Sequence, residues 1–567
     1  MGWDYTVDFL VIGSGGGGMT GAITAARNGL ETLLIEKTAY YGGTTAVSGG
    51  VVWIPDNHHM KSAGVDDSKE DARRYLQQLV GETVSDQRLM AYVTEAPEMV
   101  RFMEKNSLVE YEAVPAYSDY YPELEGGKAG ARSLDPIPYS RRKLGPVEKE
   151  MRPPTHGQIL DRFTLTAKEA HALLNFTFKT YFLLFKRLAS FYLDIPFRLA
   201  RRPDNRLTLG AALVGRLRKS MENDAIPLWL NTAARSFVEE SGRIVGVEVE
   251  RDGRIQKIRV EKGVLLACGG FAHNTAMRKQ YHPKLNGSDW SAACAANTGD
   301  GINMGAAAGG RLGLMSSAWW TPTMLMPGGR AEVLIIGKSM PGCIMVNKNG
   351  KRFTNDAGPY EEVVKAQIAA DSVESPGIPC YLIFDARYRH NYTLGSALPP
   401  GKVVPDNKVP KELFSSGWLK KTDTLHQLAE RCGIDTANLL ATVERHNEFA
   451  RTGKDLDFGR GDSITDRYYS DHSVKPNSCM APIQEAPFYA VEIYPGDLGT
   501  KGGLVCDEFG RVLNQDNQPI NGLYATGNCS ASVMGDSYPG AGSTIGPSMT
   551  FGFIAAKHAA GLYGNQG

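Results

Sequence analysis

The first 36 residues carry the pattern that most restricts how this 567-residue chain can fold. Residues 7–12 are mostly apolar and rich in β-branched side chains, which predicts a buried parallel strand. A G-x-G-x-x-G sequence over 13–18, a small-residue helix over 22–28 and a second strand over 32–35 complete a βαβ unit that ends in an acid. In such a unit the glycine backbone approaches a pyrophosphate, the helix N-terminus attracts its charge, and the acid accepts hydrogen bonds from a ribose. The chain is therefore expected to bind a dinucleotide through Gly13, Gly15, Gly16, Gly18 and Glu36.

The residues that follow Glu36 distinguish between the dinucleotides NAD and FAD, which both use this unit. A second turn rich in glycine, threonine and serine covers residues 42–50. Such a turn so close to the acid is hard to explain in an NAD domain, and it suits a long flavin that lies across several loops. FAD is therefore the predicted cofactor, with further contacts from Lys37, Gly43, Thr44, Thr45, Ser48, Gly49 and Gly50.

Later stretches of the chain are also suited to a flat cofactor. Residues 264–271 and 522–528 each read as a strand that ends in glycine, and residues 538–546 hold three glycines ahead of an apolar helix. Glycine lets the backbone pass close to a ligand where a Cβ atom would clash. Asp300 opens another helix, and taken alone it is more readily explained as a structural residue than as a cofactor contact. The cofactor contacts predicted from these stretches are Ala267, Gly269, Asp300, Gly527, Asn528, Ser543, Thr544 and Ile545.

The distribution of these signals predicts an α/β fold, in which a Rossmann-like FAD-binding domain is built from both chain ends and an α+β catalytic domain is inserted between them. The FAD-binding domain is expected to comprise residues 1–105, 205–277 and 497–567. Residues 106–204 are expected to hold a segment of the catalytic domain and a helical insertion, with loop over 124–160, and residues 278–496 the rest of the catalytic domain. Helices are predicted there over 424–432 and 435–452, the second with Asp435 as its N-cap.

Composition excludes several classes of protein. Acidic and basic residues balance at 62 each, which argues against a nucleic-acid partner. None of the eight cysteines forms a C-x-x-C pair, so no metal site is predicted, and a reduced cytoplasmic location fits best. The start of the chain has no basic segment followed by an apolar run, so no signal peptide is expected.

An apolar stripe at helical spacing runs through residues 174–192 and is followed by arginines up to 206. Lysine and arginine interrupt the stripe, and none of its apolar runs is long enough to span a membrane. The favoured interpretation is a helix packed on its own protein or on a partner subunit. A helix lying on a membrane surface through 174–206 is the alternative, and it gains weight if the substrate is a lipid.

The motifs of this chain resemble those of a known superfamily over nearly the whole length. GSGGGG with Glu36-Lys37 and GGTT, then LLACGGF, ANTGDG, VNKNGKRFTN, DLGTKGGL and GLYATGN, resemble the fumarate reductase/succinate dehydrogenase flavoproteins. Within that superfamily, SDYYPE, PYEE, PGDLGTKGG and SYPGAGSTIGP resemble the 3-ketosteroid Δ1-dehydrogenases. These motifs occur in the order and at the spacing of that family.

The resemblance implies an FAD-dependent enzyme that introduces a 1,2 double bond into a 3-ketosteroid. It implies that Tyr538 and the backbone N–H of Gly542 hold the ketone oxygen, and that Tyr360 takes the proton from carbon 2 with support from Tyr120. Carbon 1 then gives a hydride to the flavin N5 atom, and an external electron acceptor, a quinone or similar, reoxidises the flavin. Position alone favours a surface turn for residues 117–123, so the role of Tyr120 rests on the resemblance.

Three other functions stay open. A 3-ketosteroid Δ4-(5α)-dehydrogenase shares the fold and a tyrosine-based site. A fumarate-reductase-like enzyme needs cationic side chains for a dicarboxylate, but this chain has Tyr538-Pro539 where those reductases carry an arginine, and residues 497–503 replace their histidine-rich turn. A flavin binder without catalytic activity would not need tyrosines in three separate motifs.

Overall fold

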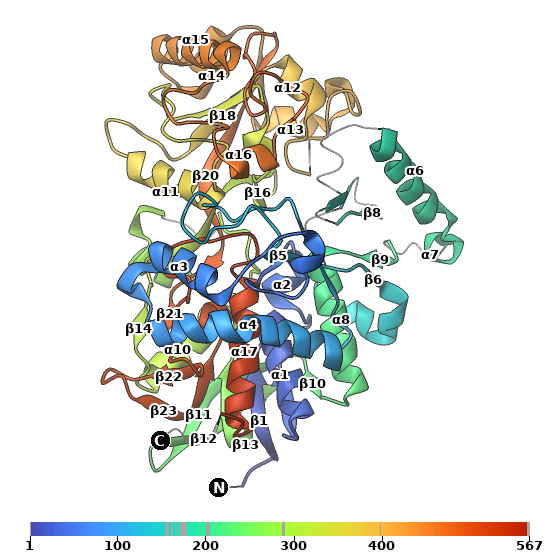
Figure 1. Cartoon of the computed structure of the whole chain (residues 1–567), viewed down its shortest axis with the longest axis vertical. Helices are drawn as coiled ribbons and strands as arrows, with labels where there is room; N and C mark the ends of the chain where they lie inside the picture. The colour runs from blue at the N-terminus through green and yellow to red at the C-terminus, as the bar shows by residue number, and fades with distance from the viewer. Residues whose placement is uncertain are drawn as a thin grey trace.

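The computed structural model describes residues 2–153, 158–159, 163–166, 168–169, 178–199, 204–285, 290–396 and 398–563. Two β-sheets organise these residues into two lobes, one below the other in Figure 1. The lower lobe surrounds an eight-stranded sheet and carries both chain ends, and we call it the large-sheet lobe. The upper lobe surrounds a six-stranded antiparallel sheet, and we call it the small-sheet lobe.

The large sheet takes its strands from the start, the middle and the end of the chain. Its order is β10-β2-β1-β13-β12-β23-β22, and β11 pairs with β12 beside this path. Strand β1 is parallel to both β2 and β13, and β13 is parallel to β23. The bounds are β1 (Tyr5–Ile12), β2 (Thr32–Ile35), β10 (Leu228–Trp229), β11 (Thr232–Glu240), β12 (Arg243–Arg251), β13 (Arg254–Leu266), β22 (Arg511–Leu513) and β23 (Pro519–Ala525). The carboxyl ends of the parallel strands therefore meet at one edge, where open α/β sheets bind ligands.

Two helices from opposite ends of the chain pack together against this sheet. They are α1 (Gly16–Arg27) and α17 (Ile545–Ala559), and α17 also packs against α4 (Asp86–Asn106) (Figure 1). Glycines allow the close approach, because a Cβ at Gly552 would lie 2.3 Å from the carbonyl oxygen of Gly17. This contact brings the loop before α17 onto the glycine-rich start of α1.

The small sheet has the order β16-β15-β20-β18-β17, with β19 paired to β20. Helix α11 (Tyr360–Ala370) packs on β15 and β20, and α14 (Leu425–Cys432) and α15 (Thr436–Thr452) pack on each other. Asp435 caps α15, because its side chain accepts a hydrogen bond from the backbone N–H of Asn438. The strand bounds are β15 (Ala318–Leu325), β16 (Ala331–Val333), β17 (Cys343–Val346), β18 (Cys380–Phe384), β19 (Lys420–Thr422) and β20 (Phe488–Thr500).

The expectation of loop throughout residues 124–160 is wrong. Strand β5 (Ser133–Pro136) lies between β3 (Val52–Trp53) and β4 (Tyr111–Ala113) in a small antiparallel sheet. A 3-10 segment, η3 (Arg141–Glu150), follows it. The pairing of β5 is entirely non-local, so the glycine- and proline-rich sequence around it gave no sign of a strand.

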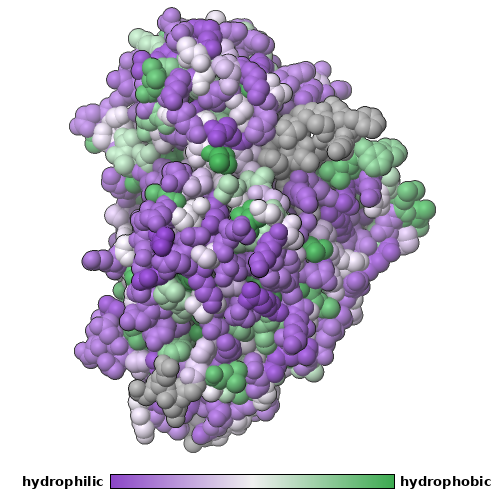
Figure 2. Space-filling model, viewed as in Figure 1, coloured by the Kyte–Doolittle hydropathy of each residue, from purple (hydrophilic) through white to green (hydrophobic). Residues whose placement is uncertain are grey.

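Helices α6 (Phe178–Leu193) and α7 (Ile195–Leu199) stand away from the body of the molecule, on the right of Figure 1. Green, hydrophobic atoms mark this projection in Figure 2. Phe182 is 63% exposed, Phe185 68%, Leu193 74% and Leu199 81%, so the described parts of the chain do not cover them. These side chains therefore do not pack on the described part of their own chain, and contact with a partner subunit or with a membrane surface stays a prediction. Within the described residues, every helix is too short or too polar to cross a membrane.

Candidate active site

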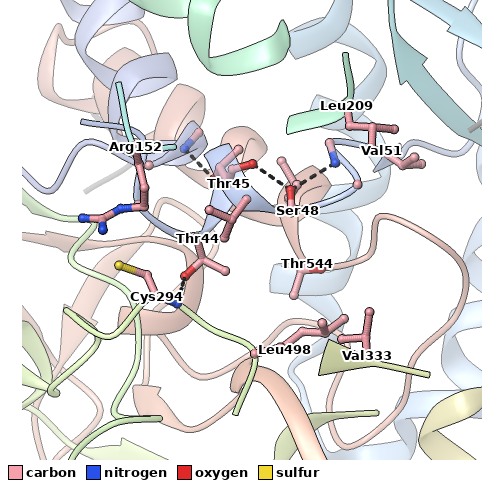
Figure 3. A pocket seen from close by; sticks show the side chains of 18 of the residues that line it. Thr44, Thr45, Ser48, Val51, Arg152, Leu209, Cys294, Val333, Leu498 and Thr544 are labelled. Carbon is pink, nitrogen blue, oxygen red and sulfur yellow. Dashed lines mark hydrogen bonds between the residues drawn. The ribbon is translucent and has the colours of Figure 1, made fainter. Parts of the chain in front are cut away.

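A cavity of about 860 Å³ extends from the carboxyl edge of the large sheet to the small-sheet lobe. At one end it is lined by the glycine-rich start of α1 and by Glu36, and at the other end by Tyr360 and Tyr538. Figure 3 shows part of its wall, where Thr44, Thr45 and Ser48 face the cavity alongside Thr544 and Leu498. The cavity thus joins the predicted cofactor site to the predicted substrate site.

The wall of this cavity fits a dinucleotide. A Cβ at Gly13 (φ +108°) would lie 2.4 Å from the carbonyl oxygen of Ala267, so only glycine fits between these two strand ends. A Cβ at Gly49 would meet no protein atom within 4 Å, because that side of the glycine is open space. Glu36 is buried at the end of β2, and its carboxylate accepts hydrogen bonds from the backbone N–H and the hydroxyl of Ser14. A glycine backbone that can approach the ligand, open space beside it and a buried carboxylate are the features by which the adenosine and pyrophosphate of FAD are bound.

The turn after Glu36 forms a short helix, α2 (Gly43–Val47), whose side chains tie three segments together. The Thr45 hydroxyl accepts a hydrogen bond of 3.1 Å from the N–H of Gly16. The Thr44 hydroxyl accepts from the N–H of Cys294 at 3.1 Å, as Figure 3 shows, and from the side-chain amide of Asn297 at 2.9 Å. The second glycine- and threonine-rich turn therefore connects the first glycine loop to the 294–297 loop around the cavity.

Most of the predicted cofactor contacts line the cavity, and two do not. The lining includes Gly13, Gly15, Gly16, Glu36, Lys37, Gly43, Thr44, Thr45, Ser48, Gly49, Gly50, Ala267, Gly269, Asp300, Gly527, Asn528, Thr544 and Ile545. Gly18 lies behind it, where a Cβ would be 2.1 Å from the carbonyl oxygen of Gly13, so this glycine serves the packing of α1 on β1. Ser543 is fully buried, and its hydroxyl donates to the carbonyl of Gly540 within the loop. Gly18 and Ser543 therefore have packing roles in this structure, and their contact with a cofactor stays a prediction.

Asp300 is the first residue of α10 (Asp300–Ala307), and it lines the cavity as well as beginning the helix. Its carboxylate forms a 2.6 Å ion pair with Lys37, which also donates to the hydroxyl of Thr298. A structural role and a cofactor contact are thus compatible for Asp300, because the residue that begins this helix also lines the cavity.

Three tyrosines that are far apart in sequence meet at the other end of the cavity. The ring centroids of Tyr120 and Tyr360 are 5.4 Å apart, those of Tyr120 and Tyr538 5.4 Å, and those of Tyr360 and Tyr538 5.2 Å. All three side chains are buried. Tyr360 and Tyr538 line the main cavity, together with Gly542.

The loop that carries Tyr538 and Gly542 is held by β3 and its neighbours. Gly542 has φ +99°, and a Cβ there would lie 2.6 Å from the backbone nitrogen of Trp53. The carbonyl of Pro539 accepts hydrogen bonds from the N–H of Tyr120 at 2.9 Å and from the hydroxyl of Tyr75 at 2.6 Å. The backbone around Gly542 is therefore fixed before any ligand binds, as an oxyanion-type donor requires.

Tyr120 is positioned by a buried ion pair next to it. Asp119 pairs with Arg132 at 2.7 Å and accepts a hydrogen bond of 2.7 Å from the indole of Trp53. The Tyr120 hydroxyl itself is buried without a hydrogen-bond partner in the part of the chain described. It borders a second, small cavity of about 20 Å³ that Tyr360 and Lys338 also line. Such a volume is enough for one water molecule beside the Tyr120–Tyr360 pair.

Burial makes all three tyrosines harder to ionise. Loss of solvent raises the pKa of Tyr360 well above 10, and it raises the pKa of Tyr120 in the same way. Burial also raises the pKa of Tyr538, but hydrogen bonding to Thr544 (3.3 Å between the hydroxyl oxygens) and to Tyr360 opposes the shift. A tyrosine that is to act as a base here needs positive potential nearby to offset burial.

The helix dipole of α11 is a source of positive potential at Tyr360, and a buried lysine–glutamate pair lies close to the tyrosines. Tyr360 is the first residue of α11, where the helix dipole favours negative charge. Lys501 lies between the two lobes, paired with the buried carboxylate of Glu361 at 2.8 Å and donating to the carbonyl of Ser537 at 3.0 Å. Glu361 follows Tyr360 and Ser537 precedes Tyr538, so one ammonium group contacts the neighbours of both tyrosines. Lys501 also lies 4.6 Å from the ring centroid of Trp319, which in turn packs on Tyr538.

The sequence did not single out several residues of this site. Tyr468 stacks on Tyr117 with ring centroids 4.4 Å apart, and the hydroxyls of Tyr117 and Tyr469 are 2.7 Å apart. All three line the cavity and residues 117–120 are buried, so the surface-turn interpretation is wrong for this part of the 117–123 stretch. The apolar wall is formed by Val333, Leu334, Ile335, Ile336, Met340 and Leu498. The two adjacent tyrosines at 468–469 could have indicated the site from the sequence. The aliphatic residues of the wall follow no sequence pattern that distinguishes them from an ordinary hydrophobic core.

The chain matches known proteins over nearly its whole length. A family model described as "FAD binding domain" matches residues 8–545. A 3-oxosteroid 1-dehydrogenase of Mycobacterium tuberculosis is 41% identical over 99% of both chains. A crystal structure of 3-ketosteroid Δ1-dehydrogenase from Sterolibacterium denitrificans, in complex with 1,4-androstadiene-3,17-dione, superposes with a TM-score of 0.94 at 41% identity over 98% of this chain and 99% of that one.

A more distant structure shares only the fold. The 3-ketosteroid-Δ4-(5α)-dehydrogenase of Rhodococcus jostii, in complex with 4-androstene-3,17-dione, has a TM-score of 0.67 at 20% identity, over 99% of this chain and 98% of that one. Both enzymes share the fold of this chain, so the fold alone does not distinguish the Δ1 reaction from the Δ4-(5α) reaction. The sequence identity differs, at 41% for the Δ1-dehydrogenase and 20% for the Δ4-(5α)-dehydrogenase. Together the comparisons confirm a mixed α/β FAD-binding flavoprotein.

Proposed function

Because the chain belongs to the FAD-dependent 3-oxosteroid 1-dehydrogenase family, we propose that it removes hydrogens from carbons 1 and 2 of a 3-ketosteroid. The observation that carries this proposal is the meeting of Tyr120, Tyr360 and Tyr538 at the end of a cavity whose other end fits FAD. When bound, FAD supplies the acceptor for the hydride from carbon 1. We also propose the predicted domain arrangement, since the large sheet contains strands from both ends of the chain.

We propose that the residues of this chain polarise the ketone and take the proton. The Tyr538 hydroxyl and the Gly542 N–H donate to the ketone oxygen, which stabilises negative charge as carbon 2 loses its hydrogen. Tyr360 takes that hydrogen as a proton from its tyrosinate form, whose negative charge is stabilised by the start of α11, and becomes the neutral phenol. Tyr120 and a water in the 20 Å³ cavity hydrogen-bond to Tyr360 and share the proton.

The charges around the cavity favour a neutral substrate. Among the described lining residues there is no histidine, and the single arginine is Arg152, which donates to Thr38 near the Glu36 end. In the described lining of the main cavity, a dicarboxylate would therefore find no arginine or histidine beside Tyr360 and Tyr538. The aliphatic wall of Val333, Ile335 and Leu498 suits the apolar rings of a steroid.

The product formed from androst-4-ene-3,17-dione tests the proposed reaction. Under anaerobic conditions the FAD-loaded protein is expected to bleach and to release a product two mass units lighter, with the new double bond between carbons 1 and 2. Conversion of a 5α-reduced 3-ketosteroid to the 4-ene, without 1,2-desaturation, would instead support the Δ4-(5α) reaction. Bleaching by succinate would contradict the steroid proposal altogether.

We further propose that α6 and α7 rest on a membrane surface, from which an apolar steroid and a quinone acceptor are exchanged. The exposed side chains of Phe182, Phe185, Leu193 and Leu199 lie on the same projection as Leu188, which lines the cavity. An apolar helical face of this kind binds at the boundary between headgroups and acyl chains. The cavity would then open next to the phase in which its substrates dissolve.

Flotation with phospholipid vesicles tests this membrane contact. A triple variant, F182S/F185S/L193S, is expected to bind vesicles at least about tenfold more weakly than the wild type. Leu456→Ser is the matched control, because Leu456 is 73% exposed in the other lobe and should not change binding. Equal flotation of the wild type and the triple variant, or no flotation of either, would contradict the proposal.

A further inference from the structure

Two histidines and a glutamate converge outside the lining of the main cavity. His58 and His59 lie in the turn after β3, and Glu104 lies near the end of α4. The Nε2 atom of His58 is 2.8 Å from one carboxylate oxygen of Glu104, and the Nε2 atom of His59 is 2.9 Å from the other. The nitrogens and the carboxylate all lie within 4.8 Å of one another. Neither histidine lines the main cavity, so this cluster is separate from the proposed reaction.

The positions of these groups are set by hydrogen bonds around them. The side-chain amide of the buried Asn57 donates to the carbonyls of Ile54 and Ala131, and its oxygen accepts from the N–H of His59. One oxygen of Glu104 also accepts a hydrogen bond of 3.1 Å from the N–H of Tyr111. Neighbouring hydrogen bonds that orient ligand side chains are typical of metal sites.

We propose that His58, His59 and Glu104 bind a divalent transition-metal ion, with Zn²⁺ as the best match. Two imidazole nitrogens and one carboxylate oxygen are ligands that suit Zn²⁺, Ni²⁺ and Cu²⁺, whereas Mg²⁺ and Ca²⁺ prefer oxygen ligands alone. Three protein ligands leave one tetrahedral position for water. On binding, the ion replaces the two N–H···O hydrogen bonds that now join the imidazoles to Glu104. The nearby Arg101 is paired with Glu98, which reduces its repulsion of the ion.

The ion would link the wall of the active site to α4. Trp53 precedes His58 by five residues, and its backbone supports Gly542. Its indole donates to Asp119 beside Tyr120. A metal held by residues 58, 59 and 104 would therefore restrain the segment on which the ketone-binding loop rests, and it would act on stability more than on the chemical step. The cysteine spacing that predicted no metal site does not bear on this cluster, because its ligands come from histidine and glutamate.

Calorimetric titration with ZnCl₂ tests the site on FAD-loaded protein that has been freed of metal by chelator and then of chelator. One Zn²⁺ per chain is expected for the wild type, and His59→Ala and Glu104→Gln should weaken binding by at least about tenfold. Zn²⁺ should also raise the apparent Tm of the wild type by about 1 °C or more, and not that of the variants.

His426→Ala is the matched control, because His426 faces Glu430 at 3.7 Å on an exposed helix without a second histidine, and its binding should equal that of the wild type. If Glu104→Gln fails to retain FAD, His58→Ala provides the same comparison with α4 unchanged. Stoichiometric binding of equal strength in the wild type and the variants would overturn the proposal, and so would the absence of any saturable Zn²⁺ binding by the wild type.

Discussion

Tyr360→Phe is expected to lower the rate of flavin reduction by about 10²–10⁴-fold, while FAD and steroid still bind. The substitution removes the hydroxyl that we propose takes the proton from carbon 2, and it keeps the ring that packs 5.2 Å from Tyr538. Anaerobic stopped-flow measurement of flavin bleaching separates this step from binding. Tyr388→Phe is the control, because Tyr388 is also buried in the same lobe and its side chain does not line the cavity.

The pH dependence of the same step distinguishes a base from a structural tyrosine. Burial raises the pKa of Tyr360 above its ordinary value of 10, so the side chain is mostly protonated at neutral pH. The tyrosinate fraction then rises about tenfold per pH unit below that pKa, and the wild-type rate should increase with pH from neutral into the alkaline range. In Tyr360→Phe, the rate of flavin reduction should not increase with pH over this range. If the variant bleaches at the wild-type rate, the base is another group.

Tyr538→Phe is expected to lower turnover by about 10²–10³-fold, the loss typical of one oxyanion-type donor. The hydroxyl of Tyr538 is 3.3 Å from that of Thr544, so it is oriented within the same loop that supplies the Gly542 N–H. Steady-state kinetics with androst-4-ene-3,17-dione should show the effect in kcat, because the ketone becomes more negative only as the reaction proceeds. An increase confined to KM would give Tyr538 a binding role and no part in stabilising the enolate-like state.

The parts of the fold that depend on local pattern were predictable from the sequence. The first strand was expected over residues 7–12 and is Tyr5–Ile12, and the second is Thr32–Ile35 as expected. Asp435 caps its helix as predicted. In each case the signal and the structure lie within the same few residues, so one segment of sequence contains all the information required.

The parts that depend on distant contacts were not predictable. Asp119 is buried because Arg132 and Trp53 meet it, and neither partner is adjacent in sequence. Strand β5 exists because β3 and β4 flank it. The stacking of Tyr117 on Tyr468 joins residues more than three hundred positions apart, so only the folded chain shows that Tyr117 lies in the cavity wall. Resemblance to a family supplied Tyr120, Tyr360 and Tyr538, whereas composition and periodicity did not.

The position of Lys501 has a consequence for which carbon atom loses its hydrogen. Its ammonium group holds Glu361 of the small-sheet lobe and the Ser537 carbonyl of the large-sheet lobe. The distance between Tyr360 and Tyr538 is therefore set by the contact between the two lobes, and not by any one local segment of the chain. If Tyr360 is the base, as we propose, a small rotation of one lobe would move it along the edge of a bound steroid while the ketone stayed in place. On the proposed mechanism, the position of the new double bond would therefore depend on how the two lobes pack, and substitutions that never touch the substrate could change it.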